Sequence, residues 1–271
     1  MELYTALESI LTTSAPQEKI AAFRDFYSAY KNGEITRVAD NHAVVFTSPS
    51  YRDFCTVIDP KEVPRRNKLG SQQGQILLTH AIAHIEYSAI DLALDAVYRF
   101  RGLGEEFERD WLSVADDEVR HFEMIDALLL ELGSYYGEYP VHDALFEASM
   151  RTLDLVERMA VVPRYLEANG LDATPLILQK LALHSSDPMV QKIISALHII
   201  LDEEIDHVRK GDKWFLYACE SEGKNSNTYF EIIEKHYPNS FPRRVDINCE
   251  ARRQAGFDKD ELEKIAFIKC K

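Results

Sequence analysis

The feature of this sequence that most limits its fold is a run of four long helical stretches in the middle of the chain. Apolar residues recur there three and four positions apart, which places them on one face of an amphipathic helix. Gly102 and Gly104 separate the first two stretches, and Asp187 followed by Pro188 is typical of a helix start. The pattern predicts helices at about residues 71–101, 105–132, 143–169 and 187–220.

Shorter elements are predicted on both sides of these helices. Residues 1–33 have the apolar spacing of a helical hairpin that divides near Pro16. Residues 41–74 are β-prone but are interrupted by three prolines, so we expect an irregular wrap and not a sheet. After Gly223 the sequence predicts a last helix in NTYFEIIEKHY and then a polar tail.

The end of the third long helix and the segment after it depend on two further signals. Gly170 stands where a left-handed C-cap residue would end the helix, and Thr174 with Pro175 could open a short helix that ends near His184.

The predicted fold is all-α, and its organisation has three parts. They are an N-terminal helical hairpin and extended wrap (1–70), a four-helix bundle (71–222), and a C-terminal helix and tail that pack on the bundle (223–271).

The composition is that of an ordinary soluble globular protein. With 271 residues, 46% hydrophobic and 28% charged, the chain is neither disordered nor low in complexity. The formal charge of −14 works against unaided binding to nucleic acid or to an anionic membrane. The most basic run, KEVPRRNK at residues 61–68, is interpreted as a solvated connection next to Pro64.

The cysteines and the termini of the sequence favour a cytoplasmic protein. Cys55, Cys219, Cys249 and Cys270 are scattered without a CxxC pair, so we expect reduced thiols and no zinc knuckle. The N-terminal residues lack the pattern of an export signal, and no apolar run is long enough to span a membrane.

Two Glu-x-x-His pairs are the strongest chemical signal in the sequence. Of the nine histidines, only His121 and His207 follow a glutamate by three positions, namely Glu118 and Glu204. Residues three apart share a helix face, and both pairs interrupt the apolar stripe of their predicted helix. An ionised carboxylate buried without a partner is strongly unfavourable, so two such pairs on core-facing stripes favour a bound cation.

The first and third predicted helices add further carboxylates. Glu86 lies about as far before the Gly102–Gly104 turn as Glu118 lies after it, so an antiparallel hairpin would bring the two to the same height. On the third helix the candidates are Glu167 and Glu157, which lie on different faces. We prefer Glu167, because a kink at Pro163 could turn it inward.

Glu, ExxH, Glu, ExxH over four helices is the ligand set of ferritin-like di-iron or di-manganese carboxylate bundles. Carboxylates with one imidazole per metal suit iron or manganese better than zinc. In this interpretation the two ExxH glutamates bridge the metals. The alternative to a metal site is a core in which the glutamates form salt bridges and the histidines have hydrogen-bond partners. The predicted cofactor is two iron ions, with manganese as the alternative, held by Glu86, Glu118, His121, Glu167, Glu204 and His207.

A second pair of histidines on the first helix has a different interpretation. His80 and His84 are one turn apart and could chelate a metal by themselves. His84 points to another face than Glu86, two positions later, so we interpret both histidines as packing groups and not as ligands, with a hydrogen-bond partner of a ligand as the alternative for His84.

At these residues the sequence closely resembles the ferritin-like family designated domain of unknown function 455. The resemblance covers about residues 61–260 and is carried by VPRRNKLGS, HAIAHIEYSAIDLALDAVYRF, DDEVRHFEMI, RMAVVPRYLEANGLDATP, DEEIDHVRKGDKWF and ARRQAGF. The acidic DEEIDHV is a small departure. The ligand order is also similar to that of the di-iron hydroxylases of tRNA and of demethoxyubiquinone, and this similarity implies Glu167 as the third-helix ligand.

The resemblance implies a fold and a metal site but no reaction. Our first hypothesis is an oxidoreductase that activates dioxygen or peroxide on an unknown substrate, a small molecule or a modified RNA. It would need a separate electron donor, because no nucleotide-binding motif is present. The alternatives are a metal-storage or peroxide-handling protein and a non-enzymatic helical scaffold. A monomer or dimer would disfavour the storage hypothesis.

Overall fold

The structure is a computed structural model that describes residues 1–38, 43–267 and 270. The described residues form helices and loops without a strand, so the predicted all-α class is confirmed. They divide into two compact units, unit 1 (Met1–Glu147) and unit 2 (Ala148–Lys271). The predicted division at residues 70 and 222 is a different one and stays a prediction.

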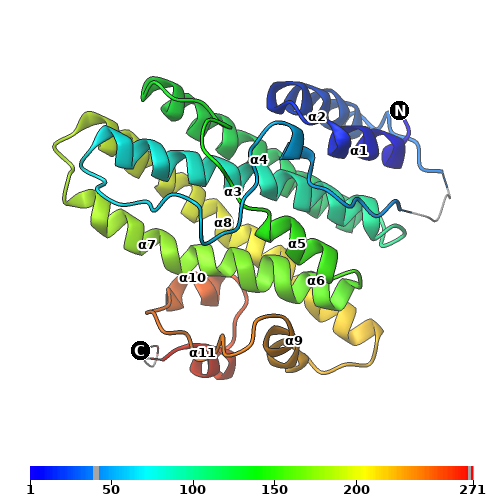
Figure 1. The fold of residues 1–271 in the computed structure, drawn as a ribbon. Coiled ribbons are helices and arrows are strands. Elements are labelled where there is room, and N and C mark those ends of the chain that lie inside the picture. The colour runs from blue at the N-terminus through cyan, green and yellow to red at the C-terminus, as the bar shows by residue number, and fades with distance from the viewer. Residues whose placement is uncertain (39–42, 268–269, 271) are drawn as a thin grey trace. The chain divides into compact units, whose positions relative to one another are not determined.

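Unit 1 is built on a hairpin of two long helices. α3 and α4 pack along each other, and the short turn between them makes them antiparallel (Figure 1). α1 packs on α3, and α2 packs on α4, so the predicted N-terminal helical hairpin is confirmed. The helices are α1 (Leu3–Thr12), α2 (Pro16–Lys31), α3 (Gln72–Arg99) and α4 (Glu105–Glu131), with a 3₁₀ turn at Ser50–Asp53.

Local sequence signals explain where α3 and α4 begin. The Ser71 hydroxyl accepts a hydrogen bond from the Gly74 N–H at 3.2 Å, which caps the start of α3. Gly102 and Gly104 have φ of +87° and +90°, a backbone conformation that favours glycine, and they turn the chain into α4. Both helices therefore lie within two residues of their predicted bounds.

The segment between α2 and α3 is irregular where it is described, as predicted. One isolated parallel bridge joins Val57 to Val141. The fully buried Lys19 forms an ion pair with Asp91 of α3, and its ammonium also donates to the Ser50 hydroxyl at 2.6 Å. A buried cation with two oxygen partners fixes this segment to the hairpin.

A histidine of α3 holds the loop that follows α4. The backbone N–H groups of Gly137 and Tyr139 donate to Nε2 of His80 at 3.0 and 3.3 Å. The imidazole can accept these bonds only in its neutral form. Burial lowers the pKa of His80 from 6.5 to about 4, although the charge of Glu138 raises it. The packing role that the sequence predicts for His80 is therefore confirmed.

We expect His80 to make the stability of the protein depend on pH. Between pH 6.5 and 4 the unfolded chain binds a proton that the folded chain does not, so the free energy of unfolding falls as the pH drops. The loss is about 1.4 kcal/mol per pH unit from this group. Denaturant titrations across this range should show a smaller loss in His80→Gln, and equal slopes in both proteins would contradict the assignment.

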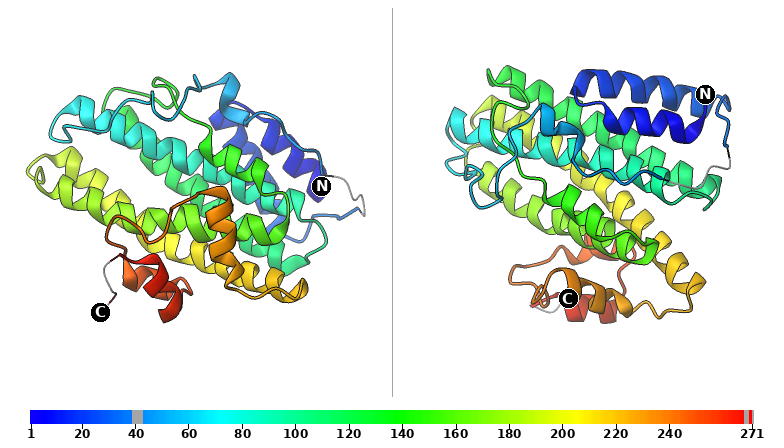
Figure 2. Two further views of the ribbon diagram at one scale, coloured as in Figure 1. Left: turned by 60° about the horizontal axis from the view of Figure 1, so that its bottom comes forward. Right: turned by 45° about the vertical axis from the view of Figure 1, so that its right-hand side comes forward.

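Unit 2 is built around one long helix, α8 (Pro188–Ser221), on which the preceding helical segments pack. These segments form one continuous run from α6 through the π-helical turn η2 to α7, as Figure 2 shows beside α8. α5 (Ala144–Arg151) spans the boundary between the units. The remaining elements are α6 (Leu155–Val161), η2 (Val162–Glu167), α7 (Ala168–Ala182), α9 (Thr228–His236), α10 (Cys249–Gln254) and α11 (Lys259–Ile265).

The single helix predicted at residues 143–169 is wrong. The chain breaks after α5, and Asp154 begins α6 by accepting a hydrogen bond from the Glu157 N–H. Pro163 has no N–H to donate, and the backbone widens there into the π-helical turn η2. Gly170 does not end a helix, because α7 continues past it and past Pro175 to Ala182.

A glycine of α8 allows the π-helical turn to pack closely. A Cβ added at Gly211 would overlap the Pro163 side chain, whereas one added at Gly170 would meet nothing within 4 Å. Only a residue without a side chain lets α8 approach η2 in this way. The glycine therefore fixes the packing of η2, which ends at Glu167, on α8.

The two glycines make a matched pair for a stability test. Gly211→Ala should lower the free energy of unfolding by about 1–3 kcal/mol because the methyl group overpacks the contact with Pro163. Gly170→Ala should raise it by about 0.5–1 kcal/mol through helix propensity. Urea denaturation measures both, and equal effects in the two variants would contradict the packing.

Buried arginines and a disulfide hold the C-terminal segment of unit 2. Arg164 of η2 forms ion pairs of 2.6 Å with Asp212 of α8 and with Glu261 of α11. Arg252 of α10 pairs with Asp172 of α7 at 2.7 Å. These contacts join η2 and α7 to α8 and the tail helices.

The expectation of four reduced cysteines is wrong in part. Cys249 and Cys270 form a disulfide, and they were overlooked because their separation of 21 residues matches no familiar motif. Cys55 and Cys219 are buried free thiols. In the described parts of the chain, no helix has both the length and the apolar character needed to cross a membrane.

Candidate metal centre

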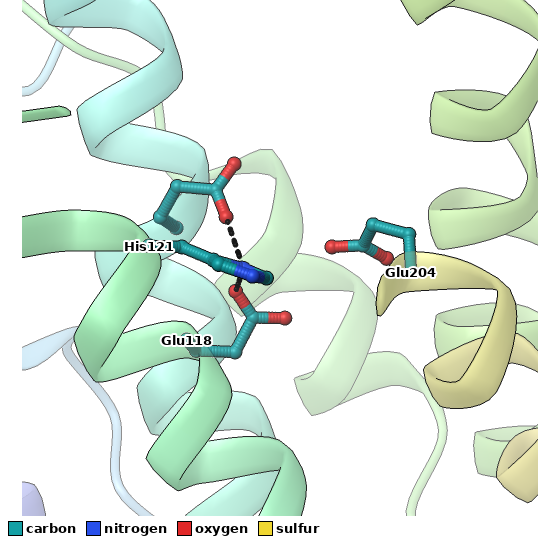
Figure 3. Close-up of side chains that lie close together, drawn as sticks. Glu118, His121 and Glu204 are labelled. Carbon is teal, nitrogen blue, oxygen red and sulfur yellow. Dashed lines mark hydrogen bonds and ion pairs between the residues drawn. The ribbon is translucent and has the colours of Figure 1, made fainter. Parts of the chain in front are cut away.

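The α3–α4 hairpin brings three predicted ligands together in unit 1. Nδ1 of His121 lies 3.2 Å from Oε2 of Glu86 and 3.4 Å from Oε2 of Glu118. Figure 3 shows Glu118 and His121 on α4, with dashed lines from the imidazole to its carboxylate neighbours. Glu86 is 4% exposed, and the other two are fully buried. The hairpin thus places Glu86 level with the first ExxH pair, as its position before the turn predicts.

The three side chains form a compensated charge cluster. Burial disfavours the charged imidazole, but hydrogen bonds and the negative charges of Glu118 and Glu86 raise the pKa of His121 to about 11. One proton is therefore held between the two carboxylates. The cluster combines concentrated negative charge with a position shielded from water.

The spacing of this cluster would allow it to hold a metal ion. One ligand atom from each of Glu86, Glu118 and His121 lies within 4.8 Å of the others, a spacing from which they could hold a metal ion. Carboxylate oxygens with one imidazole nitrogen suit iron and manganese. The two buried carboxylates would attract a cation strongly, because little solvent screens their charge.

Unit 2 carries the second ExxH pair on α8. Nδ1 of His207 lies 3.7 Å from Oε1 of Glu204, so the imidazole turns toward the glutamate one turn earlier, as in the first pair. Figure 3 shows the Glu204 side chain on its helix. His207 is fully buried. The buried Oε2 of Glu204 accepts no hydrogen bond from any residue that the structure describes.

The two candidates from the third predicted helix have different surroundings. Glu157 contacts two basic side chains of α9, with Lys235 Nζ at 2.5 Å and His236 Nε2 at 2.8 Å. Partial burial raises the pKa of Glu157, but these hydrogen bonds more than offset it and lower the pKa. Glu167 is the last residue of η2, which packs against the helix that carries Glu204.

These surroundings count against Glu157 as a metal ligand. Glu157 already has partners on α9, and the sequence did not indicate them because α9 lies far along the chain. Within the described ranges, neither Glu167 nor His207 belongs to a group of three closely spaced ligand atoms. The role of Glu167 stays a prediction, as does that of the whole ligand set.

His84 holds the backbone next to the hairpin and is not a member of the cluster. Its Nε2–H donates to the His142 carbonyl at 2.7 Å, and Nδ1 accepts from the Tyr136 hydroxyl at 3.0 Å. Both ring nitrogens are used, so His84 has no position left for a metal. The predicted packing role is confirmed, and the sequence did not reveal the partners.

Comparison with known proteins places the chain in a family. The profile of a family described as "Protein of unknown function (DUF455)" matches residues 12–263. The chain belongs to this family. A relative from Haemophilus influenzae, described as an uncharacterized protein, is 36% identical over 274 residues, covering 97% of this chain and 93% of the relative. No solved structure matches the chain.

The part of the chain that matches the DUF455 family contains all of the candidate ligands. The matched residues include Glu86, the first ExxH pair, Glu167 and the second ExxH pair. The family description assigns no activity, so the function has to be argued from the chemistry of the site.

Proposed function

We propose that this protein is a ferritin-like di-metal carboxylate oxidoreductase that activates dioxygen or peroxide on an organic substrate. The observation that carries the proposal is the cluster of Glu86, Glu118 and His121. Its two carboxylates and one imidazole lie close together and are buried from solvent. The second ExxH pair on α8 repeats the local geometry of the first. Two such pairs and two further glutamates are the donor set of di-iron and di-manganese bundles.

In this proposal the donor set is the one that the sequence predicts. Glu118, His121, Glu204 and His207 would hold two iron or two manganese ions. Glu86 and Glu167 would complete the ligand set. A pair of such ions supplies the redox steps and the oxygen or peroxide activation that protein side chains lack.

The chain's own residues set the conditions for this chemistry. Metal ligands bind in their deprotonated forms, so the proton held on His121 must leave to solvent before Nδ1 can bind a cation. Val119 and Phe122, which follow the two residues of the ExxH pair in sequence, are buried as well, so this turn of α4 is shielded from bulk water. The substrate class we propose is a small molecule or a modified RNA, with electrons from a separate donor.

One observation favours a second candidate, a metal-free helical scaffold. His121 already offsets part of the negative charge of its two carboxylate neighbours, and buried ion triads occur without metals. In that case the Glu and His side chains specify packing and bind no cation.

The test is oxygen use by the reconstituted protein. The full chain is loaded with iron(II) under anaerobic conditions and then mixed with dioxygen or hydrogen peroxide while the oxidant and the optical spectrum are followed. We expect consumption faster than that by the same concentration of free iron(II), and lost in Glu118→Ala. Bound iron that consumes neither oxidant faster than free iron would refute the oxidoreductase and favour storage.

A further inference from the structure

Unit 1 contains a cavity that the candidate metal centre does not use. Its volume is about 450 Å³, and it lies between α3, the segment 60–67 and the loop 139–142. Leu77, Ala81 and Ile85 line it from successive turns of α3. Ile85 is 41% exposed, so apolar surface in the cavity is open to solvent. Glu86 lies on another face of α3, since it is two positions beyond the lining residue His84.

Cationic side chains edge this cavity. Lys61, Arg65 and Arg66 line it and are exposed, and none of the lining residues is acidic. No carboxylate of the described residues forms an ion pair with any of these three cations. The chain has a net charge of −14, so three cations around one cavity make this part of the surface opposite in charge to the protein as a whole.

The wall of the cavity includes the imidazole of His142. Burial lowers the pKa of His142 and the positive charge of Arg66 lowers it further, while the negative charges of Asp143 and Glu147 partly offset this effect. The Ala144 N–H donates to Nδ1 of His142 at 3.4 Å, so the neutral imidazole keeps its proton on Nε2. His84 fixes the same residue by donating to its carbonyl. The wall thus offers a positioned N–H donor beside the cations.

We propose that this cavity binds a small organic oxyanion, a phosphate monoester or a carboxylate, with an apolar body. Two arginines and a lysine suit the oxygens, because guanidinium groups bind both anions through paired hydrogen bonds. The apolar body would lie on the α3 surface at Ala81 and Ile85. Apolar walls with a few placed polar groups, and a volume of this size, are typical of small-molecule sites. This site is independent of the proposed metal centre.

The test is calorimetric titration of the full chain with four probes. Phenyl phosphate and benzoate separate the two oxyanions, inorganic phosphate lacks the apolar body, and benzyl alcohol lacks the charge. We expect saturable binding of one of the two aromatic anions, at least tenfold weaker binding of inorganic phosphate, and none of benzyl alcohol. Absence of saturable binding by both aromatic anions would overturn the proposal.

Three variants locate the binding. Arg65→Gln with Arg66→Gln should weaken it at least tenfold, and Ala81→Leu should abolish it by filling the apolar wall while all cations remain. Lys68→Gln is the matched control, since it removes one charge of the same segment outside the cavity lining and should leave binding unchanged. Thermal melts without probe show that each variant folds.

Two results would overturn the assignment to the cavity. One is unchanged affinity in the Arg65→Gln, Arg66→Gln protein. The other is binding of a short RNA oligonucleotide that persists in Ala81→Leu, which would make the cations a surface for polyanions.

Discussion

Glu118→Ala is expected to lose most of the bound metal while the protein stays folded. Glu118 is fully buried, contacts His121 and is a proposed ligand, so its loss would remove a carboxylate from the centre of the ligand set. Changing even the hydrogen-bond partner of a metal ligand lowers affinity about 10–100-fold, and loss of a ligand itself should exceed this. Elemental analysis of metal per chain after purification measures the effect, with helicity followed by circular dichroism.

A matched variant on the same helix separates the metal effect from a general charge effect. Glu123→Ala removes an equal charge from α4, but the Glu123 side chain is 35% exposed and pairs with Arg24. It should keep its full metal content. Glu204→Ala should behave like Glu118→Ala, and Asp202→Ala, an exposed neighbour on α8, like the control. Equal metal content in Glu118→Ala and Glu123→Ala would contradict the proposed ligand set.

Arg164→Met is expected to give the largest loss of stability. It leaves the carboxylates of Asp212 and Glu261 without their shared cation, and both are largely buried. Breaking a buried ion pair by removing one partner destabilises a protein by about 3–5 kcal/mol. Guanidinium denaturation should show a loss of this size. Because Arg164 lies in η2, metal content should fall as well if Glu167 is a ligand.

Two control experiments test whether the buried carboxylates cause the loss of stability in Arg164→Met. Arg209→Met removes an arginine whose side chain is 57% exposed and pairs with Asp206, so its loss should be below about 1 kcal/mol. Adding Asp212→Asn and Glu261→Gln to Arg164→Met should recover part of the stability, because no uncompensated charge remains. A loss in Arg164→Met no larger than that in Arg209→Met would show that the network stabilises little.

The helices that the sequence predicted well have their signals at their own ends. α3, α4 and α8 begin and end within two residues of prediction, because Ser71, Gly104 and Asp187 act locally. The third segment failed because its breaks depend on tertiary context. Pro163 is accommodated by a π-helical turn that packs on Gly211, a residue 48 positions away, and Pro175 is tolerated inside α7.

In the candidate site, too, features set by nearby residues could be predicted, and features set by residues far along the chain could not. Each ExxH pair could be predicted because three-residue spacing on a helix sets its geometry, and Glu86 because a short turn fixes the hairpin register. Glu157 could not be excluded from sequence, since its partners Lys235 and His236 come from α9. The disulfide between Cys249 and Cys270 was missed for the same reason.

The most direct test of the central claim is the metal content of the wild-type chain. The protein is expressed aerobically without added metal, purified without chelators and measured by elemental analysis together with optical absorption. The proposed centre predicts about two iron or manganese ions per chain, with the near-ultraviolet absorption of a bridged pair when the metal is iron. Folded protein with no transition metal above background, before and after incubation with iron(II) or manganese(II), would contradict it.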